Sequence, residues 1–248
     1  MSRFAAWLAL GLLAAVPARA ATDYCGYGHG TAVLLIDRTT AFDATDKTLF
    51  LGALDGLIAR LGPGDRLVLD TMTGAYTGSQ TLFDRCKPGC PDEGFLAGLL
   101  STCRPVVARA DALAFTRELA ATLARLLESP QETPLSDLFR TVAEAVRPYA
   151  GGRDKLAALY IFSDLIENST LLPERELKRL PSAAIVKRLT SSGILATLSG
   201  TPVRVFGFGR DDSPSRPPLP QAERQRIADA WTQWLIASGA GPVEIGLR

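Results

Sequence analysis

The sequence AVLLIDRTT, residues 32–40, decides the fold class of this chain. Five apolar residues in succession, without polar alternation, are typical of a strand that is buried on both faces of a parallel sheet. The polar run DRTT, residues 37–40, follows directly, so a carboxylate and two hydroxyls come at the C-terminal end of the strand. Ligands of open α/β sheets bind at that edge. The segment therefore predicts a central buried strand with a binding site beside it.

Apolar runs and segments of helical periodicity alternate along the rest of the chain. Further strands are expected at residues 67–69, 156–162 and 202–208, with an edge strand at 243–247. Helices are expected at residues 44–61, 111–127, from about 135, at 182–199 and at 221–238. Residues 71–81 predict a turn followed by a returning antiparallel edge strand. The alternation predicts an α/β fold with a doubly wound, mostly parallel sheet, one antiparallel edge strand and helices on both faces.

The last expected helix carries an apolar stripe that includes Trp231 and Trp234. Paired tryptophans can form a ligand cradle, but three-residue spacing on one helix face is typical of core packing. We therefore expect both rings to lie in the core.

Residues 1–20 have the composition of an export signal. Arg3 supplies a positive charge, residues 4–16 form an apolar core too short to span a bilayer, and Ala-Arg-Ala at 18–20 is a cleavage signal. We expect cleavage after Ala20, and the next residue is Ala21 rather than the cysteine of a lipoprotein anchor. An alanine-rich signal suggests a bacterial envelope protein that is either periplasmic or secreted.

The charge and length of the mature chain argue against several classes of partner. Cleavage removes Arg3 and Arg19, which takes Lys+Arg from 27 to 25 against 26 Asp+Glu, so the mature chain carries a formal charge of −1. A nearly neutral chain gives no reason to expect nucleic acid or an anionic membrane surface as a partner. No apolar run after the signal reaches the length of a membrane helix, so no integral span is expected after cleavage. The 228 residues that remain of 248 suit one domain.

The exported part contains four cysteines: Cys25, Cys86, Cys90 and Cys103. An even number in an exported chain predicts two disulfides, and the returning edge strand should bring all four cysteines to the sheet edge remote from the DRTT run. Lys-Pro-Gly between Cys86 and Cys90 is a tight-turn sequence, which favours a bond between these two and a second bond between Cys25 and Cys103. A zinc site that uses the cysteines and His29, the only histidine, is the alternative.

Three polar clusters follow or precede elements that should meet at one edge of the sheet. They are Asp37 with Thr39, Thr133 in a Thr-Pro-Leu turn before a helix, and Ser163 with Asp164 after the strand at 156–162. Each alone is ordinary, since a threonine often caps a helix and polar residues often end a strand. Their convergence at the carboxyl edge is the stronger signal.

In this order the clusters resemble the metal-ion-dependent adhesion site of the von Willebrand factor A (integrin I-like) domain. That site uses Asp-x-Ser/Thr-x-Ser after the first strand, a threonine before a central helix, and an aspartate after the next long strand. The matching residues here are Asp37, Thr39, Thr133 and Asp164. The resemblance extends over roughly residues 32–240 in element order and implies that residues 21–248 form a single domain of this type.

The resemblance implies a divalent cation, Mg²⁺ first, with Mn²⁺ and Ca²⁺ as alternatives, because hard cations prefer hydroxyl and carboxylate oxygens. It also implies a protein partner that brings an acidic side chain to the cation. The chain departs from the motif at Ala41, where the family has a second hydroxyl. The alternative is that the fold persists without metal and that Asp37 and Thr39 hydrogen-bond the loops instead.

Further polar residues are expected to surround this site as a binding rim. They are Arg38 and Thr40 beside the first strand, Glu167 after Asp164, and Arg210 with Asp211 after the strand at 202–208.

Two other functions compete with a binding module. A haloacid-dehalogenase-like hydrolase would use Asp37 as its nucleophile but needs a second aspartate two residues on, where this chain has Thr39. A serine triad would depend on His29, which precedes the first strand and should lie at the opposite edge. A purely structural envelope protein is the third possibility. The sequence favours a non-enzymatic, exported interaction module that binds a protein at the C-terminal edge of its sheet.

Overall fold

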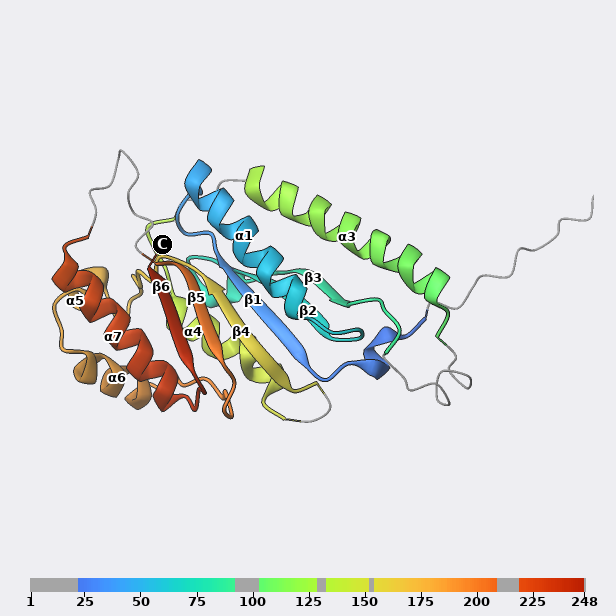
Figure 1. The fold of residues 1–248 in the computed structure, drawn as a ribbon. Coiled ribbons are helices and arrows are strands. Elements are labelled where there is room, and N and C mark those ends of the chain that lie inside the picture. The colour runs from blue at the N-terminus through green and yellow to red at the C-terminus, as the bar shows by residue number, and fades with distance from the viewer. Residues whose placement is uncertain (1–21, 92–102, 129–132, 152–153, 209–218, 248) are drawn as a thin grey trace, which may run out of the picture.

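Strand β1 (Thr31–Asp37) lies inside a six-stranded sheet, and all seven of its residues are buried. The structure is a computed structural model and describes residues 22–91, 103–128, 133–151, 154–208 and 219–247. β1 pairs in parallel with β2 on one side and with β4 on the other (Figure 1). Two-sided burial accounts for the unbroken apolar run of its sequence.

The strand order in the sheet is β3-β2-β1-β4-β5-β6. The other strands are β2 (Arg66–Met72), β3 (Thr81–Cys86), β4 (Leu156–Phe162), β5 (Val203–Phe208) and β6 (Val243–Leu247). Only β3, at one edge, runs antiparallel to its neighbour. The arrangement confirms the predicted α/β class, the mostly parallel sheet and the antiparallel edge strand, and it is consistent with a Rossmann-like fold.

Helices cover both faces of the sheet, as the alternation predicts (Figure 1). In β1, Val33 and Leu35 face the layer that contains α4, α5, α6 and α7. The alternate residues Ala32, Leu34 and Ile36 face α1 and α3. Because successive side chains of a strand point to opposite faces, β1 contributes to both halves of the core.

The helix bounds are α1 (Ala44–Arg60), α3 (Pro105–Glu128), α4 (Leu138–Val146), α5 (Glu174–Leu177), α6 (Ser182–Ser191) and α7 (Gln221–Ala237). Short 3₁₀ turns occur at Tyr24–Tyr27, Tyr76–Gly78 and Arg147–Tyr149.

Three helices differ from the sequence-based expectation by more than one residue at one end, and α5 is not among the expected helices. α3 begins at Pro105, where a proline suits the first helical turn, rather than at residue 111. α4 begins at Leu138 rather than near 135, because Ser136 pairs with Asn168 in an isolated β-bridge. α6 ends at Ser191 rather than at 199, because Gly193 adopts φ +73° and reverses the chain.

The tryptophans of α7 lie in the core, as predicted. Trp231 and Trp234 have no exposed surface, and the Trp231 ring stacks on Phe139 with a centroid separation of 3.9 Å. Trp231 Nε1 donates a hydrogen bond of 2.9 Å to the carbonyl of Leu165, and Trp234 Nε1 donates one of 2.9 Å to the carbonyl of Ile194. Their polar atoms are therefore satisfied inside the core, and α7 is tied to the loop after β4.

The expected disulfide pairing is wrong, because Cys25 bonds Cys86 and Cys90 bonds Cys103. A tight turn after Cys86 does not form. Instead Lys87 continues the antiparallel pairing of β3, donating from its N–H to the Asp65 carbonyl at 2.8 Å and accepting from the Gly64 N–H at 2.8 Å. The extended chain carries Cys90 away from Cys86.

The Cys25–Cys86 disulfide lies at the sheet edge remote from Asp37, as expected. Cys86 pairs across the sheet with Arg66, the first residue of β2, whereas Asp37 pairs with Met72, the last. The zinc alternative is wrong, because all four cysteines are in disulfides and no free thiol remains. Two disulfides fit an extracytoplasmic location.

The expected signal, residues 1–20, lies outside the described residues. Among the helices that the structure does describe, none combines the length and hydropathy that a membrane span requires.

The two disulfides should differ in their contribution to stability. Cys25–Cys86 joins residues 61 apart in sequence and Cys90–Cys103 joins residues 13 apart. Loop-closure entropy then gives contributions of about 4 and about 3 kcal/mol. We expect the double variant C25A/C86A to lose about 1 kcal/mol more unfolding free energy than C90A/C103A in urea titrations without reductant. Equal losses, or a larger loss from C90A/C103A, would contradict this expectation.

Candidate functional site

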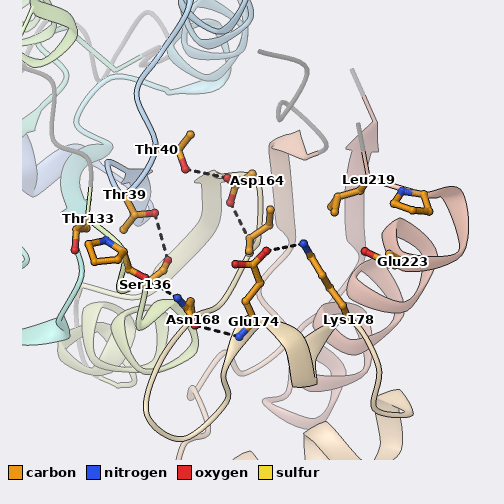
Figure 2. A pocket seen from close by; sticks show the side chains of 13 residues that line it. Thr39, Thr40, Thr133, Ser136, Asp164, Asn168, Glu174, Lys178, Leu219 and Glu223 are labelled. Carbon is orange, nitrogen blue, oxygen red and sulfur yellow. Dashed lines mark hydrogen bonds and ion pairs between the residues drawn. The ribbon is translucent and has the colours of Figure 1, made fainter. Parts of the chain in front are cut away.

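A pocket of about 570 Å³ opens at the C-terminal edge of the sheet, where β1 and β4 end (Figure 2). One wall is formed by hydroxyl, amide and carboxylate side chains: Thr39, Thr40, Thr133, Ser136, Asp164 and Asn168. The facing wall comes from α5 and the residue after it, from α7 and from the two residues before α7: Glu174, Lys178, Leu219, Pro220 and Glu223. The pocket lies where parallel α/β sheets bind ligands.

Asp37, the last residue of β1, lies beneath the pocket and has no exposed surface. Its Oδ1 accepts hydrogen bonds from the Thr39 N–H at 2.9 Å and from Thr39 Oγ1 at 2.7 Å. Its Oδ2 accepts one of 2.6 Å from Ser163 Oγ, just after β4. The carboxylate therefore orders the loop after β1 and ties it to the end of the neighbouring strand.

Ser163 was recognised in the sequence only as part of a strand end, and the structure gives it a specific role. Besides donating to Asp37, its hydroxyl accepts a hydrogen bond of 2.9 Å from the Leu165 N–H. The side chain is fully buried. Ser163 thus links the central carboxylate to the turn that follows β4.

Asp164 reaches the pocket from that turn and is 2 % exposed. Its Oδ2 accepts a hydrogen bond of 3.1 Å from Thr40 Oγ1, and its Oδ1 accepts one of 2.9 Å from the Ile166 N–H. The intervening Leu165 has φ +62°, an unfavourable left-handed conformation for a branched residue. Such conformations persist where the surroundings over-determine them, and here the Leu165 carbonyl is held by Trp231.

Thr39 and Ser136 bring two hydroxyls together on the pocket wall. Their Oγ atoms are 3.3 Å apart, and each residue is 5 % exposed. Figure 2 shows these side chains facing each other, with Thr133 to one side. Ser136 lies three residues after Thr133, and sequence reasoning missed it because the motif calls for only one hydroxyl in that loop.

Thr133, the hydroxyl that the motif matches, is also on the pocket wall. Its N–H donates to the Thr39 carbonyl at 3.4 Å, while its own Oγ1 accepts a hydrogen bond of 3.3 Å from the Leu135 N–H. It packs so closely on Gly74 that a Cβ there would lie 2.8 Å from Thr133 Oγ1. The structure thus brings Thr133 to Thr39 through the backbone.

Asn168 fixes the position of Ser136. The two residues exchange backbone hydrogen bonds of 3.0 and 2.9 Å. The Asn168 side chain donates to the Pro134 carbonyl at 2.5 Å and accepts from the Glu174 N–H at 3.1 Å. The loop before α4 and the loop after β4 therefore form one hydrogen-bonded unit.

Glu167, expected on the rim, is only 1 % exposed and lies beneath the start of α4. Its Oε2 accepts hydrogen bonds from the N–H groups of Leu138 at 2.6 Å and Phe139 at 3.2 Å, two donors that a helix leaves without intrahelical partners. Burial raises its pKa to about 8 from an ordinary 4.5, with nearby Asp137 adding to the rise and the two amide donors opposing it. Glu167 therefore caps α4.

The other residues expected on the rim lie in different places. Thr40 lines the pocket, and Arg38 is half-buried with its N–H bonded to the Met72 carbonyl at 3.0 Å. Burial lowers the pKa of the Arg38 guanidinium. Arg210 and Asp211 lie outside the described residues.

On the facing wall, Glu174 Oε1 and Lys178 Nζ form an ion pair of 2.5 Å.

The oxygen donors at the pocket suit a hard cation better than a soft one. Thr39 and Ser136 offer hydroxyls, and Asp164 offers a carboxylate beside them. Within the part of the chain that the structure describes, no group of three or more His, Cys, Asp and Glu side chains is arranged to hold a metal. A cation at this pocket would therefore need the hydroxyls as ligands.

No protein-family model matches this chain, and no curated protein matches it. Function must therefore be inferred from the geometry of the pocket, since the fold alone is compatible with many activities.

Removing the Ser163 hydroxyl should destabilise the protein. Ser163→Ala deletes a hydrogen bond to a buried carboxylate and the acceptor for the Leu165 N–H, so we expect a loss of about 1.5–3 kcal/mol in unfolding free energy. Urea unfolding measures the loss. The matched control is Ser191→Ala on α6, an exposed residue whose hydroxyl donates to the Lys187 carbonyl in its own helix, with an expected change within about 0.5 kcal/mol. A change this small for Ser163→Ala would contradict the role assigned to it.

Glu167 should make stability fall as the pH rises. Its pKa is about 8 in the folded chain against an ordinary 4.5, so the folded state holds the proton more tightly. The resulting stabilisation is complete below the unfolded pKa and is lost as the pH rises through about 8. Glu167→Gln keeps the acceptor oxygen and removes the titration.

We therefore expect the wild type to lose unfolding free energy relative to Glu167→Gln between pH 5 and about pH 8, as measured by urea unfolding at several pH values. The exposed Glu118→Gln serves as the control and should follow the wild type. A difference between the wild type and Glu167→Gln that does not change with pH would contradict the assignment.

Proposed function

We propose that this chain is an exported, non-enzymatic interaction module of the von Willebrand factor A type. It binds a divalent cation, Mg²⁺ first, with Mn²⁺ and Ca²⁺ as alternatives, at the C-terminal edge of its sheet. Through that cation it binds an acidic side chain of a protein partner. The observation that carries the proposal is the convergence of the Thr39 and Ser136 hydroxyls and the Asp164 carboxylate on one pocket, above a buried Asp37.

The order of the elements supports this proposal. The polar clusters follow β1, precede α4 and follow β4, as the family motif requires, and they belong to a mostly parallel sheet with one antiparallel edge. These loops meet through hydrogen bonds of Asp37, Thr40 and Ser136. The chain therefore agrees with the family motif in where its short polar clusters lie relative to the strands and helices.

The residues divide into those that would hold the cation and those that orient them. Thr39 and Asp164 face the pocket and would contribute oxygens, together with a hydroxyl from the loop before α4. Asp37 accepts a hydrogen bond from Thr39 Oγ1, which uses the hydrogen of that hydroxyl and leaves its oxygen to act as an acceptor or ligand. The bound cation would supply one coordination position for a partner carboxylate.

A hydrolase that uses Asp37 as a nucleophile is disfavoured by the burial of this residue. Asp37 has no exposed surface, and both of its oxygens accept short hydrogen bonds. A nucleophile must reach the substrate, whereas this carboxylate lies beneath the pocket. His29 precedes β1 and so belongs to the opposite edge.

The expected export signal and the two disulfides support a periplasmic or secreted location.

Thermal unfolding of the mature protein tests the cation. After EDTA treatment and dialysis, Mg²⁺, Mn²⁺ or Ca²⁺ at about 100 times its dissociation constant should add about 2.7 kcal/mol of stability, which raises Tm by roughly 5–10 °C. Asp164→Asn removes a charged ligand and should abolish most of this rise. The control Asp55→Asn, on the exposed surface of α1, should retain it.

If none of the three ions shifts the Tm of the wild type, the proposal that the pocket binds a divalent cation is contradicted. Phosphatase activity in the wild type that is lost in Asp37→Asn would favour the hydrolase instead.

A further inference from the structure

The contact between Thr39 and Ser136 has a defined direction. Thr39 Oγ1 has one hydrogen, which it donates in a hydrogen bond of 2.7 Å to Asp37 Oδ1. It can therefore only accept in its 3.3 Å contact with Ser136 Oγ. Ser136 therefore donates its proton to Thr39. Rotation of the Ser136 hydroxyl would release the acceptor position that it occupies on Thr39 Oγ1 and leave oxygens of both residues able to bind a cation.

The spacing of the two hydroxyls suits adjacent ligands of one cation. Neighbouring ligands of an octahedral Mg²⁺, with metal–oxygen distances of roughly 2.0–2.1 Å, lie about 3 Å apart, and the longer bonds to Ca²⁺ extend this to about 3.3–3.7 Å. The 3.3 Å between Thr39 Oγ1 and Ser136 Oγ lies at the short end of the Ca²⁺ spacing and only about 0.3 Å beyond the Mg²⁺ spacing. Only a small movement would be needed on binding.

The backbone holds Ser136 in place without using its side chain. Its N–H donates to the Asn168 carbonyl at 3.0 Å, and its carbonyl accepts from the Asn168 N–H at 2.9 Å. Two residues later, the Leu138 N–H is held by Glu167 at 2.6 Å. The hydroxyl is thus presented to the pocket from a fixed backbone.

Thr133 is oriented differently. Its Oγ1 is directed to the Leu135 N–H and packs on Gly74, and its contact with Thr39 is through the backbone. One of the two acceptor positions of Thr133 Oγ1 is therefore already used within its own turn.

Resting on the proposed function, we propose that Ser136, and not Thr133, provides the hydroxyl ligand from the loop before α4. Ser136 thereby compensates for Ala41, the position at which the first loop lacks a hydroxyl. The ligand set of this chain is then Thr39, Ser136 and Asp164, with Asp37 and Asn168 as positioning residues.

Isothermal titration calorimetry of single variants with Mn²⁺ tests this assignment. Ser136→Ala should weaken Mn²⁺ binding by about tenfold or more, whereas Thr133→Val, which keeps the shape of threonine, should stay within about threefold of the wild type. A second pair at the same position, Ser136→Thr and Ser136→Val, has matched shapes. Only the valine variant should lose affinity. Circular dichroism and Tm in EDTA show that each variant is folded.

The outcomes separate the two levels of the proposal. If the wild type binds no Mn²⁺, both the cation function and the assignment of Ser136 are overturned. If Thr133→Val loses affinity as much as Ser136→Ala or more, or if Ser136→Thr and Ser136→Val bind alike, the assignment fails while the cation function survives. If Ser136→Ala does not fold, the threonine and valine pair decides.

Discussion

A carboxylate without exposed surface joins the ends of the two central strands. Asp37 lies at the end of β1 and accepts hydrogen bonds from Thr39 in its own loop and from Ser163 after β4. A buried carboxylate is costly unless its oxygens are satisfied, so the two loops must take up positions that supply donors. Two groups at the pocket are positioned by this arrangement. The Thr39 hydroxyl is oriented by Asp37, and the Leu165 N–H is satisfied by Ser163.

The turn after β4 is also supported by aromatic side chains of the layer that contains α4 and α7. Trp231 stacks on Phe139 of α4 and bonds the carbonyl of Leu165, the residue with positive φ next to Asp164. α4 is in turn capped by Glu167, only two residues after Leu165. Core packing, helix capping and the polar pocket are therefore coupled through one short segment after β4. Such coupling fixes the geometry of the pocket before any ligand enters it, and pre-ordering of this kind generally lowers the cost of binding.

Local patterns predicted much of the architecture. β4 and β6 have the predicted bounds, α1 and α7 are each one residue shorter than expected, and the α7 tryptophans are in the core. Two of the errors arose where a partner distant in sequence overrides local preference. Lys-Pro-Gly favours a tight turn, but Lys87 pairs with the backbone of residues 64–65, so Cys86 bonds Cys25 instead. Helical spacing predicts that α4 begins near residue 135, but Ser136 pairs with Asn168 in the loop after β4. Neither partner is visible in the local sequence.

The sequence by itself indicated the parallel α/β sheet, because apolar runs without alternation are typical of strands buried on both faces and they alternate with segments of helical periodicity. It also determined that Asp37, Thr39 and Asp164 come at the carboxyl edge, since strand direction decides where a strand's last residues lie. Only the tertiary structure decided that Asp37 is buried, that Glu167 caps a helix, and that Ser136 stands opposite Thr39. These features depend on hydrogen bonds between segments far apart in the chain. The hydrophobic periodicity of one segment does not predict such bonds.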